Sequence, residues 1–301
     1  MRYKSVIFND YELDNLLVGR KNILSAKKAL ILYFMTMPGL NEYDIVYLPE
    51  FIFEDDNLAK SIQNIFPRIG ISVTSKLLNP ESKSLDYSSN PLNEIKEIHK
   101  KYPIHGIHYP ISFGSRSIQK SPKHDEYIIH SQYNWVNVIL VMEWCKSQNI
   151  SLMVEPNLYF QENSSEDFYV HMRQIFWEGI EIFRRLNRKF SDIILVVKPF
   201  YPKLKGLKDM QILDPVNIAN STLRCINESL TKERMEIMIK PVREFGISSY
   251  MKYVKFFKDY NKDNTINCLI TVDCLKEYVK EWDFKESNLE LAQTSFLNNF
   301  L

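Results

Sequence analysis

Eight short runs of strand-forming residues recur along the chain, each followed by a longer segment with helical periodicity. The runs are rich in Ile, Val, Leu, Met and Tyr, which is typical of strands buried on both faces of a parallel sheet. The predicted strands are Lys4–Phe8, Asp44–Leu48, Arg68–Val73, Gly106–Ile111, Ile150–Val154, Asp192–Val197, Glu236–Ile239 and Cys268–Val272.

Helices are predicted over Tyr133–Lys146, whose apolar residues share one face, and over Asp167–Asn187. The polar stretches Lys76–Glu94 and Ser112–His124 are expected to be long loops. Strands alternating with helices in this way predict an α/β protein, a (β/α)8 TIM barrel in a single domain over residues 1–301. The alternative is an open doubly wound sheet, although no GxGxxG motif follows the first run.

The charge balance narrows the classes of partner. The 38 Lys and Arg residues nearly equal the 37 Asp and Glu residues. Nucleic-acid binders usually carry a basic excess, so no nucleic-acid partner is expected. The longest apolar stretches, Ala29–Met35 and Val138–Met142, fall short of the roughly 20 residues that a membrane span needs. No membrane partner is expected either.

The cysteines are sparse and form no CxxC pair or zinc-ligand spacing; they are Cys145, Cys225, Cys268 and Cys274. Such usage fits a reducing compartment with buried or idle thiols. The first residues also lack the apolar run of a signal peptide. The sequence therefore predicts a cytoplasmic protein without a metal site.

Two charged residues directly follow apolar runs: Glu155 after the fifth and Lys198 after the sixth. A charge at the end of a buried strand is costly unless paired, so these side chains are expected to lie near each other. A lysine in an apolar pocket has a lowered pKa and can form a Schiff base, while a nearby carboxylate shuttles protons. A purely structural ion pair explains the pattern equally well.

Other strand ends carry weaker candidates. Asp10 follows the first run and is either a third titratable group of the site or a helix N-cap. Lys240 follows the seventh run and precedes a proline, as Lys198 does, and would lower the pKa of Lys198 by like-charge repulsion. Arg243 is a candidate anion ligand, with a solvated loop charge as the default interpretation.

His108 lies on the fourth run and either contacts the substrate from the barrel interior or packs in the core. His105 stands three residues earlier, and residues three apart on a strand point to opposite faces. The two histidines are therefore not expected to share a metal ion.

Several segments, in this order, resemble the class I fructose-bisphosphate aldolases. FMTMPGLNEYDIVYLPEFIFED resembles that family's TTPGLGEY stretch and the strand and Glu-rich turn after it. VEPN (154–157) resembles the family's VEPE, and VVKPFY (196–201) resembles LLKPNM. DPVNIANSTL (214–223) resembles SPETIAKYTL. The resemblance covers most of the chain and is carried by the combination of motifs.

The resemblance implies a barrel enzyme that forms a lysine Schiff base, with no metal or organic cofactor. Lys198 falls on the Schiff-base lysine, Glu155 on the carboxylate that assists it, and Asp10 on the first-strand aspartate of the family's AADES motif. Aldolases are commonly tetramers, so the resemblance also implies a homo-oligomer.

The departures from the family fall at substrate-contacting positions. The second carboxylate of VEPE is Asn157 here, and the Lys and Asp of GIKVDKG are Ser72 and Thr74. The strand-four lysine and arginine of KWR align near Gly106 and His108. We expect Asn157, Ser72, Thr74 and His108 to contact the substrate in place of the family's charged groups.

The phosphate-binding motifs depart as well. KPVREFG, which contains Lys240 and Arg243, replaces the glycine-lined SGGQS, so the backbone cannot form the same anion cradle. TVDC replaces SYGR, and Asp273 would repel an anion. The resemblance therefore implies a Schiff-base lyase for a small carbonyl substrate with fewer phosphates or none. The alternative is a catalytically inactive relative that binds a ligand or partner, which the missing strand-four lysine favours.

Overall fold

The computed structural model describes residues 5–17, 19, 21–35, 43–73, 91–113, 139–158, 193–197, 215–229, 236–240, 247–260, 266–268 and 270–271. The chain divides into two compact units, Met1–His108 with Ile270–Leu301, and Tyr109–Leu269. The expectation of one domain over residues 1–301 stays a prediction.

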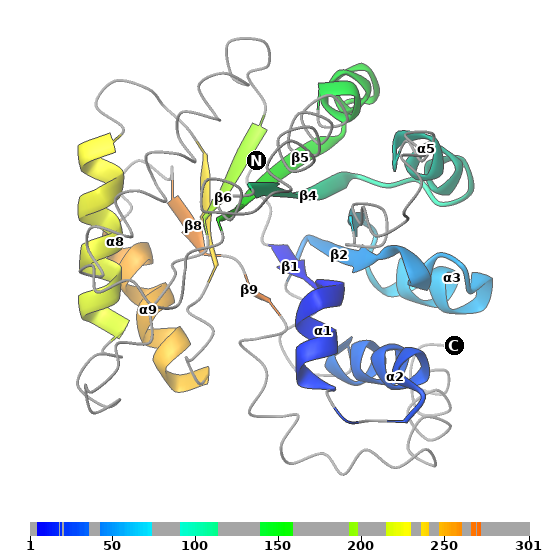
Figure 1. Ribbon diagram of the computed structural model, residues 1–301, viewed down its shortest axis with the longest axis horizontal. Coiled ribbons are helices and arrows are strands. Elements are labelled where there is room, and N and C mark those ends of the chain that lie inside the picture. The colour runs from blue at the N-terminus through cyan, green and yellow to red at the C-terminus, as the bar shows by residue number, and fades with distance from the viewer. Residues whose placement is uncertain are drawn as a thin grey trace, which may run out of the picture. The chain divides into compact units, whose positions relative to one another are not determined.

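The first unit contains parallel strands in the order β9-β1-β2-β3-β4 (Figure 1). These strands are β1 (Ser5–Ile7), β2 (Ile45–Pro49), β3 (Ile69–Ser72), β4 (Gly106–Phe113), which runs on into the second unit, and β9 (Ile270–Thr271). The helices are α1 (Asp10–Leu16), α2 (Ile23–Met35), α3 (Asp56–Ile65) and α5 (Pro91–Lys101), with a 3-10 turn, η2, over Glu50–Ile52.

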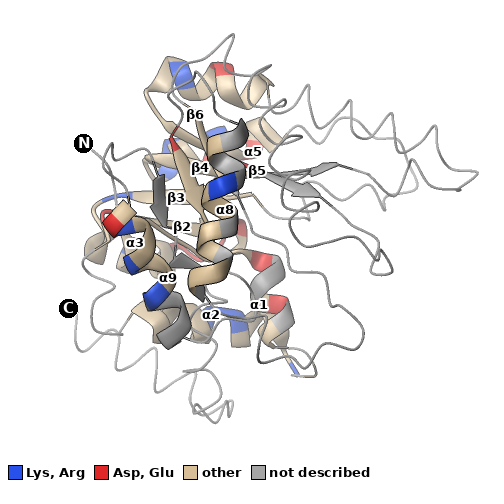
Figure 2. Ribbon diagram, turned by 90° about the vertical axis from the view of Figure 1, so that its left-hand side faces the viewer, with Lys and Arg blue, Asp and Glu red and all other residues tan. Residues whose placement is uncertain are grey.

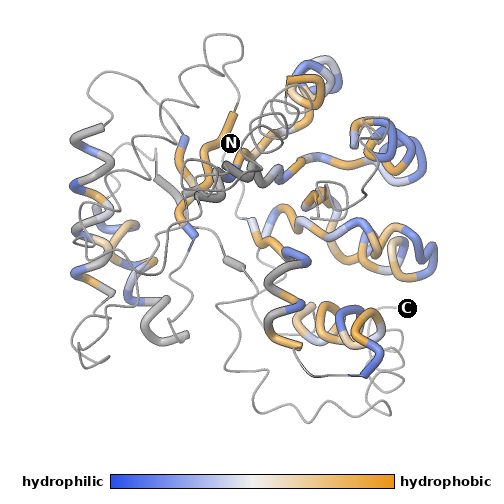
Figure 3. The backbone as a smooth tube through the Cα atoms, in the orientation of Figure 1, coloured by the Kyte–Doolittle hydropathy of each residue, from blue (hydrophilic) through white to orange (hydrophobic). Residues whose placement is uncertain are grey.

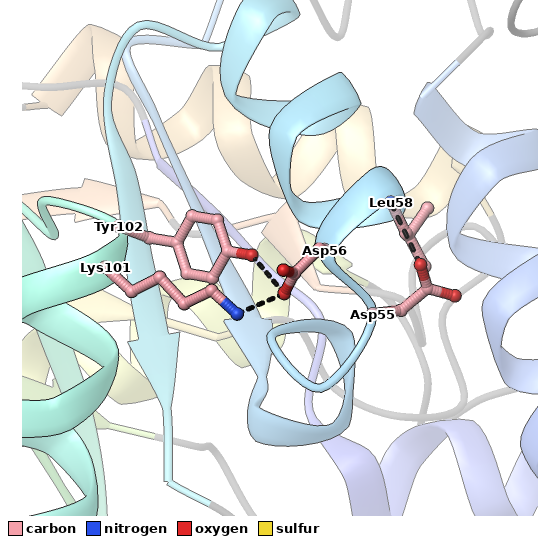
Figure 4. A network of polar contacts seen from close by, with 5 residues as sticks. All are labelled: Asp55, Asp56, Leu58, Lys101 and Tyr102. Atoms are coloured by element: carbon pink, nitrogen blue, oxygen red, sulfur yellow. Dashed lines mark hydrogen bonds and ion pairs between the residues drawn. The ribbon is translucent and has the colours of Figure 1, made fainter.

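Polar contacts fix the start of α3 and join it to α5. The Asp55 carboxylate accepts a hydrogen bond from the Leu58 backbone N–H at 3.2 Å, which satisfies a free donor of the first helical turn. The Asp56 carboxylate accepts hydrogen bonds from Lys101 and from the Tyr102 hydroxyl, the latter at 2.7 Å (Figure 4). These contacts hold α3 beside the end of α5.

The two faces of the first-unit sheet differ in polarity. The ring of Phe8, directly after β1, lies 6.0 Å from that of Phe34 in α2, so the face of the sheet that carries Phe8 is turned towards a helix. The same face carries a row of apolar residues that are in register on successive strands: Val6, Val46 and Ile69. The opposite face carries two further rows. One is Tyr47, Gly70 and Gly106, and the next is Pro49, Ser72 and His108.

The second unit contains parallel strands in the order β5-β6-β7-β8. They are β5 (Ser151–Leu158), β6 (Ile193–Val197), β7 (Ile237–Ile239) and β8 (Ile266–Cys268). The helices are α8 (Pro215–Ser229) and α9 (Ile247–Tyr260), and residues 139–148 are also helical. Asn227 of α8 donates a hydrogen bond to the Tyr260 hydroxyl of α9 at 3.3 Å, which links the two helices.

Each of the predicted strand runs overlaps an observed strand, but several limits differ. β5 continues to Leu158, so Glu155 lies within the strand rather than after it. The predicted loop Lys76–Glu94 overlaps α5, which begins at Pro91, and β4 extends to Phe113. The predicted helix Tyr133–Lys146 is helical from residue 139, whereas Asp167–Asn187 lies outside the described residues.

Sheet order decides between the two predicted architectures. From β1 to β8, strands that are neighbours along the chain are also neighbours in the sheet. The last predicted run, Cys268–Val272, contains β9, which pairs with β1, and overlaps β8, which pairs with β7, only at Cys268. A doubly wound sheet reverses its strand order at a switch point, so that alternative is wrong. The chain has the (β/α)8-barrel fold that the sequence predicts.

Charged residues lie mainly on the helices, whereas the strands carry few (Figure 2). β2 and much of α2 are hydrophobic, as expected for elements that supply the core (Figure 3). Among the described residues, those that are both charged and buried are Lys27, Glu50, Glu155 and Lys240. Buried charges need compensation, and two of these residues form one pair.

Candidate active site

Glu155 and Lys240 form a buried ion pair in the second unit. The Lys240 ammonium donates hydrogen bonds to both carboxylate oxygens of Glu155, at 3.1 Å to Oε1 and 2.9 Å to Oε2. The Lys240 side chain is 2% exposed and that of Glu155 is 3% exposed. Both charges are therefore held out of water and neutralise each other.

Sheet register explains how two residues from strands that are not adjacent meet. Glu155 lies on β5 and Lys240 directly follows β7, with β6 between them. Val196 of β6 is in register with Met238 of β7, two residues before Lys240. Neighbouring strands lie about 4.8 Å apart, so β5 and β7 are roughly 10 Å apart. Only long side chains can span that distance, and the pair closes over β6.

The sequence predicts Lys198 as the partner of Glu155, and the described structure shows that Glu155 is bound by the ammonium of Lys240. Lys198 itself lies outside the described residues, although it immediately follows Val197 at the end of β6. Thr74, Arg243 and Asp273 also lie outside them. Asn157 belongs to β5, two residues after Glu155. The roles predicted for these residues stay predictions.

A second buried polar pair lies in the first unit, where Ser72 Oγ and His108 Nδ1 are 2.9 Å apart. Ser72 is 1% exposed and His108 is fully buried. The two residues are in-register neighbours on β3 and β4, and their face is opposite to the one that Phe8 turns towards α2. His108 therefore has a hydrogen-bond partner on the face where the sequence predicts substrate contacts.

Tyr47 is a residue of this face that the sequence analysis missed. Its side chain lies across two glycines: a Cβ at Gly70 would come within 2.6 Å of its Cδ1, and one at Gly106 within 2.5 Å of its hydroxyl oxygen. Gly106 is close to the position where the aldolase resemblance requires a lysine. Tyr47 occupies the space into which any side chain at residue 106 would point. The sequence signal for this arrangement was a single glycine in each of two successive strand runs, Gly70 and Gly106, which are in register in the sheet.

Asp10 is bound by a lysine from α2. Lys27 Nζ lies 2.6 Å from Asp10 Oδ1 and 2.7 Å from Asp14 Oδ1. Burial lowers the pKa of Lys27, but the hydrogen bonds and charges of the two carboxylates outweigh it and raise that pKa above its ordinary value. α1 begins at Asp10 itself, which leaves Asn9 in the N-cap position. The catalytic role of Asp10 stays a prediction.

The described part of the chain offers little other reactive chemistry. Burial raises the pKa of the Cys145 thiol to about 12, so it is not a nucleophile near neutral pH, in line with the prediction of idle thiols. No group of three or more His, Cys, Asp or Glu residues that could hold a metal ion occurs in the described ranges. No helix within those ranges is long and apolar enough to cross a membrane.

The fold is similar to solved aldolase structures. Fructose-bisphosphate aldolase from Plasmodium falciparum, in complex with TRAP and a small-molecule inhibitor, matches with a TM-score of 0.59 at 12% identity, covering 98% of this chain and 87% of that chain. An archaeal fructose-1,6-bisphosphate aldolase, with its catalytic Lys covalently bound to the carbinolamine intermediate of the substrate, matches with a TM-score of 0.44 at 12% identity, over 97% of this chain and 92% of that one.

No protein-family model matches the chain, and a search of the curated proteins finds no match. The likeness to the Plasmodium enzyme shows an aldolase-like (β/α)8-barrel fold. Fold alone hosts many chemistries, so activity has to be argued from the site.

Proposed function

We propose that the protein is a class I aldolase-type lyase that forms a Schiff base between Lys198 and a small carbonyl substrate. The observation that carries the proposal is the buried Glu155–Lys240 pair, which closes over β6 where Lys198 follows it in the chain. The aldolase-like fold and the VEPN and VVKPFY motifs support the same assignment.

Strand alternation supports a shared face for the three groups. Val154 is in register with Leu195, so Glu155 is on the face of Val196, and Met238 continues that row on β7. Lys240 is two residues after Met238, and Lys198 is two residues after Val196. We propose that this alternation continues past the end of β6, which would bring Lys198 to the face that carries Glu155 and Lys240.

In the proposed mechanism Glu155 shuttles one proton. The Lys198 ammonium gives a proton to the Glu155 carboxylate and becomes the free amine. The amine nitrogen bonds to the carbonyl carbon, and one of its protons moves to the carbonyl oxygen to give a carbinolamine. Glu155 then protonates the hydroxyl, water leaves, and the C=N iminium forms with Glu155 again ionised. The iminium is the electron sink for carbon–carbon cleavage or condensation.

We propose a substrate with fewer phosphates than a sugar bisphosphate, or none. Lys240 and Arg243 are the cations of KPVREFG, in the region where the resembled family has its glycine-lined cradle. The Lys240 ammonium is bound to both Glu155 oxygens, so a phosphate would have to compete with this carboxylate for it. Cleavage of fructose 1,6-bisphosphate is therefore expected to be weak, and robust turnover of that sugar would overturn this part of the proposal.

Borohydride trapping tests the proposed chemistry. The purified protein is incubated with a panel of aldehydes and ketones, phosphorylated and not, then reduced and analysed by intact mass and peptide mapping. A stable adduct on Lys198 with one compound class is expected, and Lys198→Ala should abolish it. Lys255→Ala is the matched control, because Lys255 is an exposed lysine of α9.

A non-catalytic binding protein is the second candidate function. The specific observation in its favour is that Glu155 is already paired in a buried salt bridge, as a structural carboxylate would be. A folded protein that gives no adduct with any compound of the panel would favour this candidate over the lyase.

A further inference from the structure

Lys240 has no equivalent in the catalytic set that the aldolase resemblance supplies, and yet it makes the best-defined contact of the site. Its ammonium bonds both oxygens of a carboxylate that is almost fully buried. A buried carboxylate without a compensating charge takes up a proton, because burial disfavours the charged form. The ammonium at 2.9 Å supplies that compensation.

The surroundings of the pair contribute few other charges. The described residues on the same face of β5, β6 and β7 include Met153, Ile194, Val196 and Met238, which are apolar. Glu236 is the remaining described titratable residue on this face of β7. It stands four residues before Lys240, about 13 Å away along an extended strand. Within the described part of the sheet, Lys240 is the cation that binds the Glu155 carboxylate directly.

We infer that Lys240 is a positioning residue, which keeps Glu155 ionised and aimed over the end of β6. This inference rests on the proposed Schiff-base function. Because Glu155 starts as a carboxylate, it enters the reaction as a proton acceptor and becomes an acid only after taking the proton of the attacking lysine. The bidentate contact fixes its orientation, and the ammonium of Lys240 neither forms nor breaks a covalent bond.

The inference predicts what happens when the cation is removed. In Lys240→Met, Glu155 either takes a proton or draws the Lys198 ammonium as its new counter-ion. A protonated Glu155 cannot accept the proton of Lys198, and a Lys198 ammonium paired with Glu155 is not the free amine. In either case the rate of adduct formation on Lys198 near neutral pH should fall on the order of 100-fold. Lys240→Arg keeps the positive charge and should restore most of the rate.

Two measurements test the inference on folded protein, below the unfolding temperature of each variant. The first is the rate of borohydride-trapped adduct on Lys198 against pH, for wild type, Lys240→Met, Lys240→Arg and the double variant Glu155→Gln/Lys240→Met. The expected result is a pH profile displaced to higher pH in Lys240→Met and close to wild type in Lys240→Arg. The double variant should be slow at every pH, because it lacks the proton shuttle.

The second measurement is infrared spectroscopy, which detects the carbonyl stretch of a protonated carboxyl group and needs no substrate. In Lys240→Met, Glu155 either becomes protonated, which produces this band, or stays ionised by pairing with Lys198. In the double variant Lys240→Met/Lys198→Ala neither lysine is present, so the band should appear. Absence of the band from Lys240→Met/Lys198→Ala would overturn the ionisation argument. Equal trapping rates and pH profiles in wild type and Lys240→Met would overturn the positioning role. A wild-type protein that traps no carbonyl compound would instead overturn the proposed function.

Discussion

Two buried polar pairs within the described residues differ in charge and in the distance that their side chains span. Ser72 and His108 are in-register neighbours on adjacent strands and meet through one hydrogen bond of 2.9 Å. Glu155 and Lys240 come from strands separated by β6 and meet through two hydrogen bonds between full charges. A short side chain such as serine can contact only the next strand, whereas Glu and Lys together can span two strand spacings.

This difference predicts how much stability the protein loses when one partner of each pair is substituted. When one partner of a buried hydrogen bond such as Ser72–His108 is removed, the remaining polar group loses that bond, which costs about 1–3 kcal/mol. A buried charge that loses its partner costs about 3–5 kcal/mol, because its desolvation is no longer compensated. Loss of one partner should therefore cost more at the Glu155–Lys240 pair than at the Ser72–His108 pair. The Glu155–Lys240 pair is also the one to which we assign the proposed chemistry.

The largest expected effect is that of Lys240→Met on stability. The variant removes the ammonium that is bound to the buried Glu155 carboxylate and should lower the free energy of unfolding by about 3–5 kcal/mol near pH 7. Glu155→Gln/Lys240→Met removes both charges and should recover much of that loss. Urea unfolding of both variants, with exposed Lys255→Met as the control, checks the comparison. A double variant less stable than the single one would contradict it.

Gly106→Ala should also be strongly destabilising, because the new Cβ would lie 2.5 Å from the Tyr47 hydroxyl oxygen. Overpacking of this kind typically costs about 1–3 kcal/mol. Combining it with Tyr47→Leu removes the clashing ring atoms, so the double variant should lose less stability than the sum of the two single variants. A double-mutant cycle by thermal or urea unfolding measures this coupling, and strict additivity would show that Tyr47 is not the obstacle.

Ser72→Ala probes the neutral pair directly. His108 keeps its buried position but loses the Ser72 hydroxyl, at an expected cost of about 1–3 kcal/mol in the free energy of unfolding. The loss should be smaller than that of Lys240→Met under the same conditions. If the two variants were equally destabilising, the distinction drawn here between neutral and charged pairs would fail.

The smallest effect is expected outside both pairs, at the start of α3. Asp55→Ala removes the N-cap hydrogen bond to Leu58 and should cost about 1 kcal/mol (Figure 4). Asp55→Asn retains an acceptor and serves as the matched control, so it should retain most of the stability.

The contribution of Asp55 should also depend on pH. Burial raises the pKa of its carboxyl, but hydrogen bonds from Leu58 and Lys28 outweigh burial and hold that pKa below its ordinary value of 3.8. A lowered folded-state pKa stabilises the ionised form, so the contribution is present above about pH 4 and is lost as pH falls through the folded-state pKa. Urea unfolding should show the difference between wild type and Asp55→Asn shrinking towards pH 3, and a difference that grew on acidification would contradict the assignment.

Sequence patterns located the strands and two of the buried polar groups. Each predicted strand run overlaps an observed strand, because a run of apolar and β-branched residues favours a strand through local sequence alone. Glu155 and Lys240 were both singled out by their place at the end of such runs. The limits of the strands were less well predicted: β5 passes through Pro156 to Leu158, although a proline usually argues against a central strand.

The pairing of those groups could not be predicted from the sequence. The predicted pairing of Glu155 with Lys198 stays a prediction, because Lys198 lies outside the described residues. The contact of Glu155 with Lys240, which follows a strand further away, was not predicted. Tyr47 was missed because its significance depends on Gly70 and Gly106, which lie 23 and 59 residues later in the chain. The sequence by itself determined the order and type of elements, because those follow from local periodicity. Which side chains meet was decided only by the tertiary structure, because contacts between residues far apart in the chain depend on sheet register and on the reach of each side chain.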